Sequence, residues 1–224
     1  MKKQLLVIPA LGMLVILGYL VWADNIPCHL LPRDAKICNG TPGSDVITLL
    51  AGDVAIATKI ETINGDAGND RVTVDYRYNQ KLTINGGEGN DHIFSGNKDD
   101  TLNGDAGNDR LYGNGGNDTI NGGDGNDLLV GGRGQDTLTG GGGNDTFILR
   151  REDAEGKKET ITCTTDASDR SLIRLLGFSR QDLSVQGLRQ GPLPKGQKIT
   201  ISDGTPKGQF EIETGPGLCV IVLS

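Results

Sequence analysis

The sequence has little of the material that builds an ordinary protein core. Aromatic residues make up 4% of the 224 residues and hydrophobic residues 35%, whereas glycine alone supplies 35 positions. Glycine brings no side chain to bury and loses more conformational entropy than any other residue when the chain becomes ordered. The composition therefore excludes a conventional apolar core along the whole chain. Either part of the chain is disordered, or something other than apolar burial stabilises it.

Residues that commonly carry out catalysis are also scarce. The chain has two histidines, His29 and His92, and it lacks both the HExxH motif of zinc proteases and the GxSxG motif of lipases. The aspartates are numerous, but the repeat described below gives each of them a structural task. We therefore expect no enzymatic activity. An enzymatic function would need a site within 150–224, where no motif indicates one.

A basic surface is missing as well. The formal net charge is −7, and the cationic residues form no stripe. Such a chain is unsuited to binding nucleic acid or an anionic membrane. Cations are the partners that this charge favours.

The N-terminus has the pattern of a secretory signal. Lys2 and Lys3 precede a mostly apolar run over 5–21, and the small residue Ala23 follows it. We expect residues 1–23 to be a signal peptide and the rest of the chain to be secreted. The alternative is an uncleaved membrane anchor, because the apolar run is nearly long enough to span a bilayer.

Cysteine is absent between residues 39 and 162, and the four cysteines flank this gap in two pairs. In an exported chain they predict the disulfides Cys28–Cys38, which would close an N-terminal flank over 24–39, and Cys163–Cys219. Four free thiols are the alternative. Neither pair could staple the glycine-rich part of the chain, so its stability must have another source.

What the sequence does contain is a nonapeptide repeat. From Gly86 to Ile148 the chain divides without a gap into GGEGNDHIF, SGNKDDTLN, GDAGNDRLY, GNGGNDTIN, GGDGNDLLV, GGRGQDTLT and GGGGNDTFI. Position 6 is aspartate in every unit, and position 8 is always apolar. Two further copies precede this block: GDAGNDRVT begins at Gly65, and the weaker GTPGSDVIT begins at Gly40.

Each position of the unit has a physical task. Glycines at positions 1, 2 and 4 allow a tight turn with positive φ and let backbone carbonyls crowd together. The aspartate adds an anionic oxygen, and closely spaced carbonyls and carboxylates suit Ca²⁺, which accepts six to eight oxygen ligands. Positions 7 to 9 predict a very short strand whose middle residue points inward. Such strands are stable only when successive units stack.

This pattern resembles the RTX, or haemolysin-type, calcium-binding nonapeptide GGxGxDxUx. The resemblance implies an all-β fold: a right-handed parallel β-roll over 40–148, with two nonapeptide units in each coil. It also implies several calcium ions, each held between a turn and the corresponding turn of the next coil. The lower turn would give the carbonyls of positions 2 and 4 and its aspartate, and the upper turn the carbonyls of positions 1 and 3 and its aspartate.

Carried onto this chain, the resemblance implies calcium sites along two edges of the roll. The first edge holds the turns that begin at residues 65, 86, 104, 122 and 140, and the second edge holds those at 95, 113 and 131. On the first edge the implied ligands are Asp66, Gly68, Asp70, Gly86, Gly87, Glu88, Gly89, Asp91, Gly104, Asp105, Ala106, Gly107, Asp109, Gly122, Gly123, Asp124, Gly125, Asp127, Gly140, Gly142 and Asp145.

On the second edge the implied ligands are Gly96, Lys98, Asp100, Gly113, Asn114, Gly115, Gly116, Asp118, Gly131, Arg133 and Asp136. The site between turns 95 and 113 is suspect, because Lys98 stands where glycine belongs. We expect Lys98 to strain that turn and to set a cation near the metal. The copies at Gly65 and Gly40 fit extra coils whose opposite edge is a longer segment that does not bind calcium.

The glycine rhythm stops after Ile148, and short apolar runs separated by turn signals follow over 149–224. We expect a small antiparallel β-structure there that caps the roll, although the run that contains Leu172, Leu175 and Leu176 also fits a helix. Without calcium we expect the repeats to be disordered. The sequence thus predicts a secreted, non-enzymatic, monomeric calcium-binding protein; the alternative is an adhesion or glycan-binding module in which 149–224 reads a cell-surface ligand.

Overall fold

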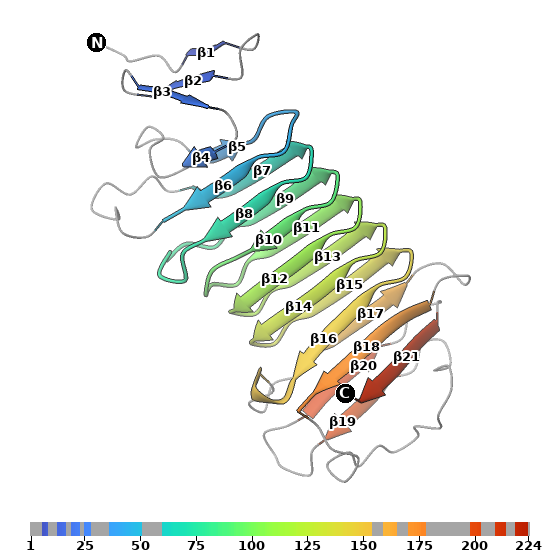
Figure 1. Ribbon diagram of the computed structural model, residues 1–224. Coiled ribbons are helices and arrows are strands. Elements are labelled where there is room, and N and C mark those ends of the chain that lie inside the picture. Colours follow the sequence, from blue (N-terminus) through green and yellow to red (C-terminus); the bar gives the residue numbers. More distant parts are fainter. Residues whose placement is uncertain are drawn as a thin grey trace.

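The computed structural model describes residues 6–8, 13–16, 19–22, 25–27, 36–50, 60–153, 159–164, 170–177, 198–202, 209–213 and 218–223. Within these ranges the chain has almost no helix, and most of its strands stack in parallel, one coil above another, as a β-solenoid (Figure 1). The predicted all-β parallel roll is therefore confirmed. The expected cysteine partner Cys28 lies outside the described residues.

Two long parallel sheets form the walls of the solenoid. The first sheet has the order β21-β18-β16-β14-β12-β10-β8-β6-β4, and the second has the order β17-β15-β13-β11-β9-β7-β5. The strands of the first sheet are β4 (Asn25–Pro27), β6 (Val46–Leu49), β8 (Arg71–Val74), β10 (His92–Phe94), β12 (Arg110–Gly115), β14 (Leu128–Arg133), β16 (Thr146–Arg150), β18 (Arg170–Leu176) and β21 (Leu218–Leu223). Those of the second sheet are β5 (Ile37–Asn39), β7 (Thr62–Ala67), β9 (Thr83–Glu88), β11 (Thr101–Ala106), β13 (Thr119–Asp124), β15 (Thr137–Gly142) and β17 (Thr160–Thr164).

The register of these strands follows from the repeat. In the regular block each residue pairs with its equivalent two units later in the chain, as Leu102 does with Ile120 and Leu111 with Leu129. Side chains alternate across a strand, so the middle residue of each short strand faces inward. That residue is position 8, and it is fully buried in every unit: Ile93, Leu102, Leu111, Ile120, Leu129, Leu138 and Phe147. A single coil could not bury these side chains, so the core exists only because coils stack.

The two outlying copies add coils with longer spacing, as expected. Ile63 pairs with Ile84, and Cys38 pairs with Ile63, so both pairings enclose more of the chain than those of the regular block. In the coil that begins at Gly65 the extra residues lie between β8 and β9 on the second edge, where Tyr78 donates a hydrogen bond of 2.8 Å from its hydroxyl to the Ile60 carbonyl. This insertion therefore lengthens one edge without disturbing the register of the other.

The outer faces of the sheets carry ladders of side chains. On the second sheet the Asn103 amide donates to Asn85 at 2.7 Å, and the Asn85 amide donates to Asn64 at 2.8 Å. On the first sheet the rings of Phe94 and Tyr112 are stacked, with centroids 4.7 Å apart. Such cross-strand pairs stabilise a sheet independently of the edges.

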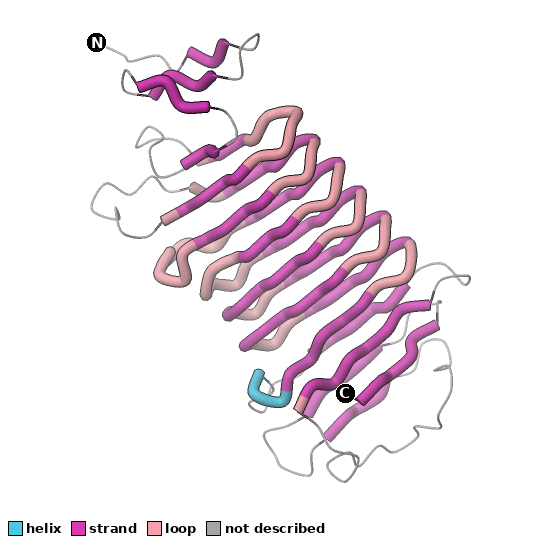
Figure 2. The backbone as a smooth tube through the Cα atoms, viewed as in Figure 1, coloured by secondary structure: helices cyan, strands magenta, loops and turns pink. Residues whose placement is uncertain are grey.

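The C-terminal region adds further parallel strands to both walls beyond the last repeat. The strands β17, β18 and β21 pair in parallel with their neighbours, whereas β19 (Lys198–Ser202) and β20 (Gln209–Glu213) form an antiparallel pair. The expected antiparallel arrangement is thus limited to this pair among the described residues of the region. The run with the three leucines is strand β18, not a helix, because Ile173 and Leu175 are buried and alternate with more exposed neighbours. A short 3-10 helix, Arg151–Asp153, precedes this part (Figure 2).

The apolar N-terminal run has β backbone. The strands β1 (Leu6–Ile8), β2 (Met13–Ile16) and β3 (Tyr19–Trp22) form an antiparallel sheet. In the part of the chain that is described, no helix is both long and apolar enough to cross a membrane.

Candidate metal centres

The turns at the two edges of the solenoid have a left-handed backbone at two positions. Positions 2 and 4 have φ between 66° and 151° in the turns at 65, 86, 104, 113, 122, 131 and 140. Most of these residues are glycine, which reaches this region without steric cost. Three are Asp66, Asp105 and Asn114, and aspartate and asparagine tolerate this region better than most residues. The glycine-rich sequence is therefore required by the turn geometry.

Position 1 is glycine for a different reason, which corrects the expectation of positive φ there. Neither Gly86 nor Gly104 has a left-handed backbone. A Cβ on Gly86 would instead collide with the carboxylate of Asp91 and would approach the carbonyl oxygen of Gly104 to 2.8 Å. Position 1 thus leaves open a space that lies between a carboxylate and the carbonyl of the turn above.

Backbone carbonyls from consecutive turns face one another across this space. The carbonyl oxygens of Asp105 and Gly107, at positions 2 and 4, lie where a Cβ on Gly123 or Gly125 in the next turn of the first edge would stand. The carbonyl of position 1 points back from the upper turn toward the lower one, as Gly122 does toward Gly104. The structure therefore brings together the carbonyls that the resemblance implied.

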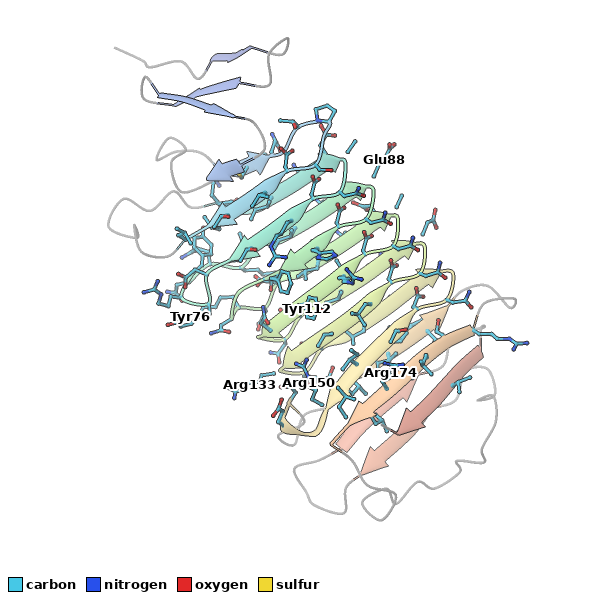
Figure 3. All side chains as sticks on the ribbon, in the orientation of Figure 1. Tyr76, Glu88, Tyr112, Arg133, Arg150 and Arg174 are labelled. Atoms are coloured by element: carbon cyan, nitrogen blue, oxygen red, sulfur yellow. The ribbon has the colours of Figure 1, made fainter. Side chains whose placement is uncertain are left out.

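The carbonyl of position 3 also points down to the lower turn. The Gly107 N–H donates to the Asp124 carbonyl at 2.8 Å, and the same bond joins Gly116 to Arg133 at 2.9 Å on the second edge. Figure 3 shows Glu88 at one edge of the roll and Arg133 at the opposite edge. Position 3 therefore contributes its backbone, which explains why its side chain varies from Glu to Ala to Arg.

The aspartates of position 6 form a buried column along each edge. Asp91, Asp109 and Asp127 are at most 2% exposed, although each carries an ionisable carboxyl group. One oxygen, Oδ1, accepts a hydrogen bond from the backbone N–H of the aspartate in the turn below: Asp91 N–H donates to Asp109 at 2.7 Å and Asp109 N–H to Asp127 at 2.8 Å. The other oxygen, Oδ2, is buried without a hydrogen-bond partner in Asp70, Asp91, Asp109, Asp118 and Asp127.

Burial makes the ionisation of these carboxyl groups unfavourable. Desolvation raises the pKa of Asp70 and Asp127 to about 6, that of Asp109 to about 7 and that of Asp118 to about 9, and in each case the hydrogen bond from the turn below opposes the rise. Neighbouring carboxylates raise the pKa of Asp109 further. A buried anionic oxygen without a hydrogen-bond partner destabilises the folded chain. A column of such oxygens therefore indicates that a positive charge binds beside them.

The donor set fits Ca²⁺. The donors that face the space between two turns are two carboxylates together with backbone carbonyls, which are the hard oxygen ligands that calcium prefers. Among the described residues no group of three or more His, Cys, Asp or Glu side chains could hold a metal by itself. Backbone carbonyls must therefore supply most of the ligands at each site.

One implied calcium site, between the turns at 95 and 113, is filled by a side chain of the protein itself, which the sequence did not predict. Ser95 occupies position 1 of its turn, and its hydroxyl oxygen lies 2.8 Å from both the Asp100 carboxylate and the Gly113 carbonyl. The Gly96 carbonyl accepts the Gly115 N–H at 3.3 Å. Two of the six implied ligands, the Asp100 carboxylate and the Gly113 carbonyl, are thus already in contact with the Ser95 hydroxyl.

Lys98 does not act in the expected way at this turn. Its side chain is exposed, and neither Gly96 nor Lys98 has positive φ, so the turn has changed conformation instead of being strained. The signal in the sequence was the loss of glycine at position 1, because the unit that begins at Ser95 is the only one of the regular block to lack it.

A second feature missed from the sequence is the role of position 5. Its side-chain oxygen accepts the backbone N–H of position 5 in the turn above, from Asn90 to Asn69 at 2.7 Å and from Asn126 to Asn108 at 2.8 Å. This ladder holds consecutive turns together without metal. The near-constant Asn at position 5 was visible in the repeat.

Each column of aspartates ends at a residue of another type or at a closed turn. On the second edge the N-terminal end is Leu82, whose N–H donates to Asp100 at 2.8 Å. On the first edge the weak copy at Gly40 does enter the column, because the Asp45 N–H donates to Asp70 at 2.7 Å. The Asp45 carboxylate, however, accepts the Thr41 N–H at 2.6 Å, so the carboxylate of this N-terminal turn is hydrogen-bonded within its own turn.

Comparison with protein-family models gives a match to the RTX calcium-binding nonapeptide repeat, in four copies over residues 59–75, 85–120, 94–129 and 121–150. These ranges coincide with the turns whose carbonyls and carboxylates converge, and they cover less than half of the chain. Comparison with the curated proteins finds no match. Residues 59–75 and 85–150 of this chain therefore match the RTX calcium-binding nonapeptide repeat, and the structure folds this region as a β-solenoid.

Proposed function

We propose that this protein is an exported, non-enzymatic calcium-binding protein whose roll folds when it binds several Ca²⁺ ions. The observation that carries the proposal is the column of buried aspartates whose Oδ2 atoms have no hydrogen-bond partner and face converging carbonyls. Four sites lie on the first edge, between the turns at 65, 86, 104, 122 and 140. A fifth lies between the turns at 113 and 131, and the closed turn at 95 holds none.

The residues of the chain determine how binding would be coupled to folding. On the first edge the interior aspartates Asp91, Asp109 and Asp127 each belong to two neighbouring sites, and each site joins two coils. Bound calcium would supply the positive charge that the buried carboxylates lack. Because the coil contributes little apolar area and many glycines, the free energy of binding becomes free energy of folding.

Circular dichroism in the presence of calcium and of EDTA tests this proposal. We expect strong β-signal with millimolar calcium, the range typical of extracellular modules, and a cooperative loss of that signal on chelation. Magnesium at the same concentration is the control, because it demands tighter octahedral geometry. An unchanged β-content after chelation would contradict the proposal.

We also propose that the bridges Cys28–Cys38 and Cys163–Cys219 close the two ends of the roll. Cys38 and Cys163 are fully buried, and neither is a free thiol. Cys219 lies in β21, in register with the buried Ser171 of the neighbouring strand β18. Peptide mapping without reduction decides the pairing: a link between the N-terminal and C-terminal pairs would refute it.

The described part of 149–224 supports the role of closing the roll. Its parallel strands extend both walls and bury Ile161, Ile173 and Leu175 against the last repeat. This arrangement supplies a non-repetitive end to the open solenoid, as repeat proteins require.

A further inference from the structure

Glu159 stands outside the repeats but takes the place of a position-6 aspartate. It immediately precedes β17, whose first residue Thr160 pairs with Thr137 of β15. The Thr160 N–H donates to the Asp136 carbonyl at 2.9 Å, in the way that Thr137 N–H donates to Asp118 at 2.8 Å one coil below. In the second column Glu159 therefore follows Asp100, Asp118 and Asp136.

The carboxylate of Glu159 has the environment of the aspartates below it. Its side chain is 2% exposed, and it accepts a hydrogen bond from the backbone of Asp136. Its second oxygen, Oε2, is buried without a hydrogen-bond partner. Nothing in the protein around Glu159 that the structure describes satisfies this oxygen.

The first edge ends in a contrasting way. There the position above Asp145 is taken by Ser171, whose hydroxyl oxygen accepts the Asp145 N–H at 3.2 Å and lies 3.5 Å from the Asp145 carboxylate. A neutral hydroxyl thus closes the first column, just as Ser95 closes the turn below Asp118. The second column has a carboxylate at its end where a neutral group would have sufficed.

We propose that Glu159 and Asp136 form an additional calcium site, which joins the last turn of the second edge to strand β17. The carbonyls of Gly132 and Gly134 would complete it from below, because both residues have the left-handed backbone that aims these carbonyls upward in the other turns. This inference rests on the proposed calcium binding and extends it beyond the nonapeptide repeats.

The site would make the docking of the C-terminal region depend on calcium. Without a cation, the Glu159 carboxylate lies close to those of Asp136, Asp153 and Asp118, and burial together with these neighbours raises its pKa to about 9. A cation between Glu159 and Asp136 would remove that repulsion and tie β17 to β15. The alternative is that Glu159 is a buried, protonated acid with no ligand.

Counting bound calcium by native mass spectrometry separates the two possibilities. The purified protein, Glu159→Gln and Glu159→Asp are compared at saturating calcium, with Glu152→Gln as the matched control, since Glu152 is exposed in the same segment. If the wild-type protein binds n ions, we expect n − 1 ions for Glu159→Gln and n ions for Glu152→Gln. We also expect n ions for Glu159→Asp, because aspartate stands at the equivalent position in the repeats.

The other outcomes are distinct. A count of n for Glu159→Gln overturns the site while leaving the repeats as calcium-binding units. A loss in both Glu159 variants also overturns it, because the longer side chain would then be needed for packing. A wild-type count of zero would instead contradict the proposed function itself. Thermal unfolding gives a second readout: the Tm of Glu159→Gln should rise less with increasing calcium concentration than the Tm of the wild-type protein and of Glu152→Gln.

Discussion

Replacing Asp109 with asparagine should have opposite effects on the calcium-free and the calcium-bound roll. Asparagine keeps an oxygen that can accept the Asp91 N–H, a bond of 2.7 Å, so the ladder between turns is preserved. It removes only the charge and one strong ligand. The substitution therefore tests the charge of the column with little change in shape.

The magnitude for the calcium-free state follows from the raised pKa. Desolvation first, and neighbouring carboxylates second, raise the pKa of Asp109 from 3.8 to about 7 in the folded chain. A rise of this size corresponds to about 4 kcal/mol at pH 8, where the carboxylate must ionise against its surroundings. Asp109→Asn removes this cost, and it should stabilise the calcium-free roll by up to about 4 kcal/mol.

The calcium-bound state should respond in the other direction. Asp109 contributes to the site below it, shared with Asp91, and to the site above it, shared with Asp127. Loss of one anionic ligand from both should raise the calcium midpoint by on the order of tenfold and reduce its cooperativity. Circular dichroism during calcium titration measures the shift of the midpoint. The residual β-signal in EDTA at pH 8, which the substitution should increase, measures the effect on the calcium-free chain.

Asp100→Asn is the matched control. The Asp100 carboxylate already lies 2.8 Å from the Ser95 hydroxyl, so neutralising it should barely change the calcium midpoint. Asp145→Asn should have an intermediate effect, because Asp145 ends its column and serves one site. A shift for Asp100→Asn as large as that for Asp109→Asn would refute the assignment of sites, and a destabilised calcium-free Asp109→Asn would refute the electrostatic reasoning.

Three further predictions concern closure, pH and turn geometry. Ser95→Gly should destabilise the calcium-bound protein by about 1–3 kcal/mol in urea unfolding, because Asp100 loses its hydroxyl partner. Native mass spectrometry should show no calcium lost, and a lost ion would make Ser95 a ligand. The folded-state pKa values of Asp109 and Asp127 lie above the unfolded value of 3.8. The calcium-free roll should therefore be most stable below about pH 4 and should lose stability as the pH rises to about 7. A β-signal in EDTA that grows with pH would contradict this prediction. Gly107→Ala should destabilise the calcium-bound protein by about 1–3 kcal/mol, because φ is +138° there and the added Cβ would collide with the carbonyl of the turn below. Gly142→Ala, at position 3, has no such conflict and should leave the stability unchanged. Thermal unfolding with calcium measures both variants.

Much of the candidate site could be predicted because the repeat is strict. A nonapeptide period, with aspartate at position 6 and an apolar residue at position 8, fixes which side chains share a column once two units complete a coil. Interior residues such as Ile93 and Leu111 had to be buried, since position 8 is the only regular apolar position. Gly65 and Gly40 could be assigned to the same edge because their spacings exceed whole coils by a few residues that an edge loop absorbs.

The closed turn and the extra carboxylate could not be derived in the same way. Lys98 attracted attention because it is a cation at a glycine position, yet its side chain reaches solvent, and the hydroxyl of Ser95 closes the site. Glu159 lies outside the glycine rhythm, and nothing in its immediate sequence distinguishes it from a surface glutamate. Its position became clear only from the pairing of Thr160 with Thr137.

The sequence by itself determined the repeat, its buried apolar position and its column of aspartates, because these depend on short-range periodicity that every unit repeats, and the resemblance to RTX repeats supplied the solenoid and its two edges. Only the tertiary structure decided where the columns end. Whether Ser171, Leu82 or Glu159 stands above or below the last aspartate depends on how the non-repetitive segments return to the walls of the roll, through pairings between residues far apart in the chain. The local sequence carries no record of such pairings, since a single residue in register converts an open calcium turn into a closed one.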